Sequence, residues 1–166
     1  MAQYATTTEA DAYFDTRLHS QLWEGSSPAD KNKALAQATR AIDRLRFVGQ
    51  RNSVYAVVQA GLSSEEAIAQ AVAEQPLEFP RDADEEVPED IKIACYEEAF
   101  TLLDGKDPDA ELEDLPVVSQ GYSSVRVTVD RSFVQEHLNA GICSPRAWRY
   151  IKPYLAEARD VRINRV

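Results

Sequence analysis

The sequence predicts a mainly α-helical protein, a small helical bundle with one β-hairpin and an extended C-terminal tail. Apolar residues recur every three or four positions over most of the chain, as on the buried face of an amphipathic helix. Strict alternation of apolar and polar residues is confined to one segment, residues 117–130, and to the last residues of the chain. At 166 residues the chain is long enough to bury one core without disulfides.

Capping signals predict the first two helices. Thr6 followed by Glu9 matches a capping box and predicts a helix over about 8–19, with an apolar stripe that consists of Ala10, Tyr13, Phe14 and Leu18. Ser27 and Pro28 predict the next start, because serine suits the N-cap and proline suits the first helical position. The apolar stripe of this second helix continues toward Gly49 and consists of Leu35, Ala38, Ile42 and Leu45.

Two short helices and two acidic loops are expected in the middle of the chain. Residues 54–60 and 65–74 predict short helices, of which the second has only a thin apolar face. Residues 82–90 and 104–116 are rich in Asp, Glu and Pro, which predicts solvated loops.

An extended segment then leads into a long helix. Pro80 disfavours the helical backbone for Phe79, so the chain is expected to arrive extended, with the ring as a packing anchor. Two interpretations of Arg81 stay open, a salt bridge at the edge of the core or a contact with a partner. Pro88 suits a helix start, and the apolar stripe over 91–103 predicts a helix that crosses the core.

The C-terminal third contains the predicted hairpin and the last helix. Val125, Val127 and Val129 alternate with polar residues, which predicts a hairpin over about 117–130. Residues 132–139 fit a short helix or an irregular excursion. The last helix is expected to begin at Ser144-Pro145 and to be kinked by Pro153; its buried side is marked by Ala147, Trp148, Ile151, Tyr154 and Leu155.

The reactive residue types form no constellation that predicts chemistry. His19 and His137 lack the spacing of a metal pair or of a catalytic base. Cys143 precedes a helix start but has no base beside it in the sequence, and Cys95 is expected to be a small buried hydrophobe. The acids at 82–86 lack the glycine-placed spacing of a calcium loop. We therefore expect no catalytic residue, no metal site and no cofactor.

The charge is strongly acidic and unevenly distributed. The net charge of −10 at pH 7 argues against a protein whose main task is to bind nucleic acid. Residues 74–114 hold sixteen acids and three bases, whereas residues 144–166 are basic. In segment 146–154, basic residues alternate with aromatic residues. The helical spacing of the aromatic rings predicts that they pack in the core rather than stack on nucleobases. No signal-peptide pattern or membrane-spanning run is visible, so we expect a reducing, cytoplasmic setting and no membrane partner.

Several segments, in their order and spacing, carry a family resemblance. They are Tyr4–Phe14, Trp23, Ala34–Phe47, Phe79-Pro80-Arg81, Val87-Pro88 with its helix, and Ser144–Leu155 with Val161-Arg162-Ile163. Together they cover most of the chain and resemble the head-tail adaptors, or head completion proteins, of the tailed-bacteriophage neck. The helical residues between Phe47 and Phe79 depart from the family pattern.

The resemblance implies a structural virion protein of the neck, assembled in the host cytoplasm. Members of the family form a ring, commonly twelve-fold, that joins the portal to another neck or tail protein and lets DNA pass without specific binding. Residues 1–158 would form the adaptor domain and residues 159–166 a docking tail. The implied portal contacts are Arg159, Val161, Arg162, Ile163, Arg165 and Val166. The implied contacts of the hairpin with neighbouring copies or a distal component are Tyr122, Val125, Arg126, Val127 and Val129.

Two alternative functions stay open. Related sequences are sometimes described as resembling the single-stranded-DNA-binding domains of primosomes, and a helical interaction module of a host cell is a third reading. Retention of single strands at moderate salt would favour the first alternative. The acids of residues 74–114 fit the adaptor as channel walls that repel phosphate, which is a hypothesis about the assembled ring.

Overall fold

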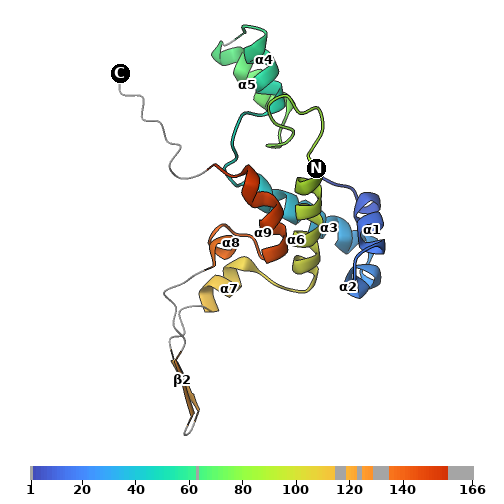
Figure 1. The fold of residues 1–166 in the computed structure, drawn as a ribbon, viewed down its shortest axis with the longest axis vertical. Helices are drawn as coiled ribbons and strands as arrows, with labels where there is room; N and C mark the ends of the chain where they lie inside the picture. Colours follow the sequence, from blue (N-terminus) through green and yellow to red (C-terminus); the bar gives the residue numbers. More distant parts are fainter. Residues whose placement is uncertain (1, 63, 115–118, 123–124, 129–134, 157–166) are drawn as a thin grey trace.

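The computed structural model describes residues 2–62, 64–114, 119–122, 125–128 and 135–156, and this part of the chain is mainly helical (Figure 1). The predicted α class is therefore confirmed. The helices are α1 (Thr7–Asp15), α2 (Gln21–Gly25), α3 (Pro28–Asp43), α4 (Asn52–Gln59), α5 (Glu65–Glu74), α6 (Glu89–Leu103), α7 (Pro108–Asp114), α8 (Glu136–Asn139), α9 (Pro145–Ile151) and the 3-10 turn η1 (Lys152–Tyr154).

Two four-residue strands, β1 (Ser119–Tyr122) and β2 (Val125–Thr128), are paired antiparallel. Residues 117–118, 123–124 and 129–130 of the predicted hairpin lie outside the described residues. The hairpin over 117–130 therefore stays a prediction. Figure 1 shows the strands at the opposite end of the molecule from α4 and α5.

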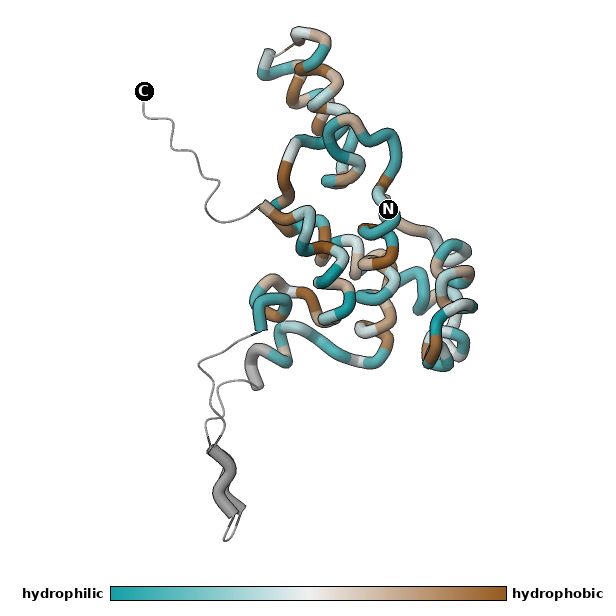
Figure 2. Tube along the Cα trace, viewed as in Figure 1, coloured by the Kyte–Doolittle hydropathy of each residue, from teal (hydrophilic) through white to brown (hydrophobic). Residues whose placement is uncertain are grey.

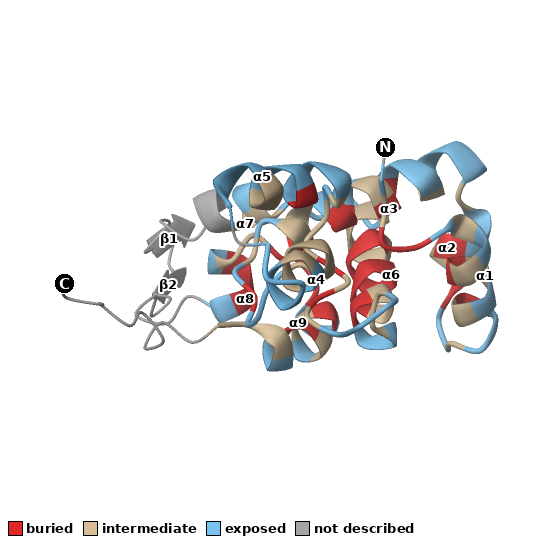
Figure 3. Ribbon diagram, turned by 90° about the horizontal axis from the view of Figure 1, so that it is seen from above, coloured by how far each residue is buried: buried red, intermediate tan, exposed pale blue. Residues whose placement is uncertain are grey.

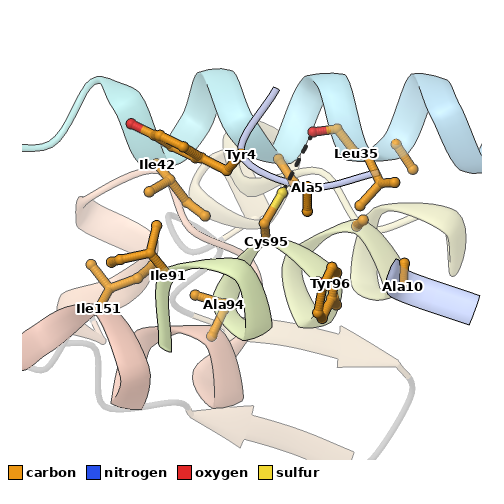
Figure 4. Close-up of a cluster of buried hydrophobic side chains, with 14 of the residues drawn as sticks. Tyr4, Ala5, Ala10, Leu35, Ile42, Ile91, Ala94, Cys95, Tyr96 and Ile151 are labelled. Carbon is orange, nitrogen blue, oxygen red and sulfur yellow. Dashed lines mark hydrogen bonds between the residues drawn. The ribbon is translucent and has the colours of Figure 1, made fainter. Parts of the chain in front are cut away.

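The core is built around α6, which packs against both α3 and α9. Figure 4 shows Leu35 and Ile42 of α3 facing Ile91 and Cys95 of α6. Cys95 is fully buried, and its Sγ lies 3.7 Å from the carbonyl oxygen of Leu35, which confirms the prediction of a small buried residue. The helix that was expected to cross the core does so.

The N-terminal helices add an aromatic cluster to this core. The Phe14 ring stacks on Trp23 and on Phe100, with centroids 4.6 and 5.5 Å apart respectively. The indole Nε1 of Trp23 donates to Asp11 at 2.7 Å, so its polar group is satisfied at the edge of the cluster. The capping box at Thr6 and Glu9 is present and sets the start of α1.

Phe79 is the anchor that the sequence predicted. It is 3% exposed and contacts the rings of Tyr4, Phe47 and Tyr154 edge to face. The bond between Phe79 and Pro80 is cis. The ring thereby joins the segment that precedes α6 to the N-terminus, to the end of α3 and to the turn after α9.

Several predicted boundaries were wrong. The first helix ends at Asp15 rather than near 19, and Leu18, expected on its apolar stripe, is 81% exposed. The second helix ends at Asp43, before Gly49. The 104–116 segment contains α7 instead of only a loop, because Pro108 and the acids after it suit a helix N-terminus.

The last helix is shorter than expected. It ends at Ile151, and Pro153 lies in the 3-10 turn that follows, rather than in a kinked continuation. Proline has no N–H to donate to the preceding turn, which favours this early end. Of the two interpretations of residues 132–139, the structure shows a short helix, α8, over Glu136–Asn139.

The helices α4 and α5 form a two-helix arm that projects from the bundle (Figure 1). We define the arm as residues 52–74. Buried residues are concentrated in α3 and α6, whereas the arm is mostly exposed or half-buried (Figure 3). Ala71 is the one buried residue that α4 and α5 contain.

Candidate interaction surfaces

The predicted portal-binding residues, Arg159, Val161, Arg162, Ile163, Arg165 and Val166, lie outside the described residues. Their role stays a prediction. Of the predicted hairpin contacts, Tyr122 is paired with Val125, Arg126 with Gly121, and Val127 with Gln120. Val129 lies outside the described residues. The pairing brings Tyr122 and Val125 opposite each other and leaves the partner of this surface to be assigned by experiment.

Cys143 and His137 are held in the bundle interior, whereas His19 is exposed. Cys143 is 3% exposed, and burial raises the pKa of its thiol to about 12, with Glu98 adding to the effect. His137 is 7% exposed, and burial lowers its pKa. A thiol with a raised pKa is a poor nucleophile at neutral pH. Within the described segments, no group of three or more His, Cys, Asp and Glu side chains is arranged to hold a metal ion.

Glu97 is the centre of a buried charge cluster on α6. Its Oε1 accepts hydrogen bonds from the Tyr13 hydroxyl at 2.7 Å and from Arg17 Nε at 2.7 Å, and its Oε2 accepts from Arg17 Nη2 at 2.9 Å. The Arg17 guanidinium also lies over the Phe100 ring, 4.5 Å from its centroid. Arg146 adds a longer contact of 3.4 Å. The carboxylate is fully engaged, so its role is to join α1, α6 and α9.

Glu98, the next residue, has a different structural task. It is fully buried, and its two oxygens accept the backbone N–H groups of Cys143 at 3.0 Å and Ser144 at 2.8 Å. Burial raises the pKa of this carboxyl, while the two backbone donors oppose the rise. Ser144 in turn caps α9 through the N–H of Ala147. Glu98 therefore fixes the position at which α9 begins.

A polar network holds the base of the arm. Arg51 donates to Glu78 Oε1 from Nε at 3.2 Å and from Nη2 at 2.8 Å, and to the carbonyl of Gln75 at 3.2 Å. Gln75 Nε2 donates to the carbonyl of Pro80 at 2.8 Å, and its Oε1 accepts the N–H of Ser53 at 3.0 Å. These bonds connect both ends of the arm to the segment that carries Phe79.

Arg81 completes this network from the bundle side. It is 8% exposed, forms a salt bridge with Glu78, and donates to the carbonyls of Val48 at 2.8 Å and Gly49 at 2.5 Å. The interpretation of Arg81 as a salt bridge at the edge of the core is confirmed. Because its donors are engaged within the chain, the partner-contact interpretation is not supported.

A shallow groove runs along the middle of α3. Its volume is about 490 Å³, and its lining residues are Gln3, Asn32, Lys33, Ala36, Gln37 and Arg40. Two of these are cations and none is an acid. Lys33 pairs with Asp30 on the same helix at 3.0 Å, with both side chains largely exposed. For Arg40, an exposed residue, the described residues provide no salt bridge. This basic face of an acidic protein was not predicted from the sequence.

The segment proposed for single-strand binding, residues 146–154, packs against the bundle. Ile151 is fully buried, and Trp148 and Tyr154 pack against the core cluster. Rings engaged in this way are not free to form a stacking platform for bases.

The chain was compared with protein-family models, with curated proteins and with solved structures. None of them matches. A separate structural observation concerns membranes: among the helices of the described ranges, none is both long enough and apolar enough to cross one.

Proposed function

We propose that the protein is a structural component of a bacteriophage neck, a head-tail adaptor that forms a ring between the portal and the next neck or tail protein. In this role it has no enzymatic activity and needs no cofactor. The proposal starts from the resemblance of several sequence segments, in their order and spacing, to head-tail adaptors. The positions of the projecting elements and of the exposed charges support it.

The observation that carries the proposal is the position of the two projecting elements. The arm and the paired strands β1 and β2 extend from opposite ends of one helical bundle (Figure 1). A bundle with a contact element at each end suits a protein that bridges two others. The buried Glu97, Glu98 and Arg81 are engaged in bonds that hold the fold, so the interior supplies rigidity rather than a reactive site.

The charge distribution supports passage of DNA without specific binding. Exposed acids gather in the loop before α6 and at the start of that helix, at Asp84, Glu85, Glu86, Glu89 and Asp90. If these side chains face the channel of the assembled ring, they repel phosphate and keep DNA from adhering. The tail over 159–166, rich in arginine, and the hairpin over 117–130 are the proposed contacts with the portal and with neighbouring copies or the distal component.

Electron microscopy of the chain mixed with the portal protein of the same phage tests the proposal. We expect a ring attached to the portal, with the mature protein located in the neck of the virion. A chain truncated after Ala158 should fold with an unchanged thermal transition but should not attach. Attachment of the truncated chain would refute the assignment of the tail, and failure of the full chain to attach would refute the adaptor role.

A further inference from the structure

The arm carries apolar side chains that the described part of the chain does not cover. Among the described residues five large hydrophobic side chains are exposed, and three of them lie on the arm: Val58 at 38%, Leu62 at 60% and Val72 at 40%. Figure 2 shows brown, hydrophobic positions along this projecting pair of helices. Exposed apolar surface is a mark of contact sites, and this one element holds three of the five exposed large hydrophobic side chains of the described residues.

The charge of the arm decides what kind of partner fits it. Residues 52–74 contain no Lys, Arg or His and three acids, Glu65, Glu66 and Glu74, all of which are exposed. If two arms packed against each other, as in a two-fold symmetric dimer, acids would meet acids. Like charges brought together in an interface cost free energy, so the arm needs a basic partner surface.

The α3 groove is such a surface on the same chain. Lys33 and Arg40 lie seven residues apart, so both lie on one side of the helix, and Ala36 lies between them at the groove. The aliphatic stems of the two cations, together with Ala36, offer apolar contact area beneath the charges. The groove therefore complements both properties of the arm, its exposed hydrophobic side chains and its negative charge.

We propose that the arm of one copy docks in the α3 groove of a second copy, with Leu62 and Val58 against Ala36 and with Glu65 and Glu66 facing the cations. Because arm and groove are different surfaces, the contact is head-to-tail, and repetition of such a contact closes into a ring when the rotation permits. The inference rests on the proposed adaptor function in that it assigns the contact between copies of the ring.

Charge reversal on the full chain tests the contact without the portal. The arm variant is Glu65→Lys with Glu66→Lys, and the groove variant is Lys33→Glu with Arg40→Glu. The matched control, Asp15→Lys with Asp104→Lys, makes the same charge change at exposed acids outside the arm, the groove and the acidic loop before α6. Sedimentation velocity at low salt and millimolar protein measures association, and circular dichroism confirms that each variant is folded.

We expect the wild type and the control to associate and each reversed variant to associate more weakly by on the order of tenfold or more. An equimolar mixture of the two reversed variants should regain association. The basic arm of one variant fits the acidic groove of the other, and the acidic arm of the second fits the basic groove of the first. A wild-type chain that stays monomeric, or a mixture no stronger than its components, overturns the inference. Attachment to the portal is measured separately with the wild type. If the wild type associates in a charge-dependent way but does not attach to the portal, the adaptor role alone is refuted.

Discussion

Replacing Arg17 with methionine should destabilise the fold by about 3 kcal/mol, because it leaves the Glu97 carboxylate buried without its main cation. The Glu97 side chain is 2% exposed and the Arg17 side chain 14%, so solvent screens the pair little. Arg17 supplies two of the short hydrogen bonds to Glu97 and also lies over Phe100. The Tyr13 hydroxyl and the more distant Arg146 remain, which keeps the loss at the lower end of the range for broken buried pairs.

Thermal and urea unfolding, followed by circular dichroism, measure this loss. At about 2–4 °C per kcal/mol for a chain of this size, the midpoint should fall by about 6–12 °C. The control Arg46→Met removes an exposed arginine and should change the free energy of unfolding by no more than about 0.5 kcal/mol. The double variant Arg17→Met with Glu97→Met removes both charges and should recover part of the loss. A loss below about 1 kcal/mol for Arg17→Met, or a double variant no more stable than the single one, would refute the reasoning.

Three further predictions concern a glycine, a cap and nucleic acid. Gly49→Ala should cost at least about 1 kcal/mol in urea unfolding, since φ is +82° and a Cβ would lie 2.0 Å from Asp82 Oδ2; an unchanged midpoint would contradict this. Hydrogen bonds from Thr6, together with a hydrogen bond and the charge of Lys92, lower the pKa of Glu9 from 4.5 to about 2. This stabilisation is present above pH 4.5 and is lost as the pH falls from 4.5 to about 2. The difference in the free energy of unfolding between wild type and Thr6→Ala should therefore shrink over this range rather than stay constant. In an electrophoretic shift at moderate salt the protein should not retain single-stranded DNA; retention that depends on residues 146–154 would favour the primosomal alternative.

The parts of the fold that the sequence predicted well are those specified by local signals. Ser27 and Pro28 start α3 where expected, because an N-cap hydroxyl and a proline at N1 act on the next few residues only. Pro88 likewise precedes α6, and the serine cap at Ser64 starts α5. The same local signal at Pro108 was missed, because the dense acids around it were interpreted as a solvated loop.

The contacts that join distant segments could not be predicted. Spacing suggested that Leu18 would be buried, but α1 ends before it, and the core is completed instead by Trp23. Nothing in the local sequence indicates that Arg51 reaches Glu78, 27 residues away, or that Glu98 accepts the N–H groups at the start of α9. The two short helices α4 and α5, and the thin apolar face of α5, were predicted from the sequence. Their projection from the bundle depends on the fold of the rest of the chain.

The cations discussed above fall into two groups, those that hold the fold together and those that are exposed on the surface. Arg17 is engaged with the buried Glu97, and Arg51 and Arg81 with the half-buried Glu78 at the base of the arm. These arginines offset the carboxylates and cannot serve a partner without loss of stability. Lys33 and Arg40 on the α3 groove are exposed and have no such task beyond the weak surface pair with Asp30. An acidic chain that contacts its own copies must meet them through the cations left on its surface. This requirement favours the groove over any two-fold contact between arms as the site of assembly.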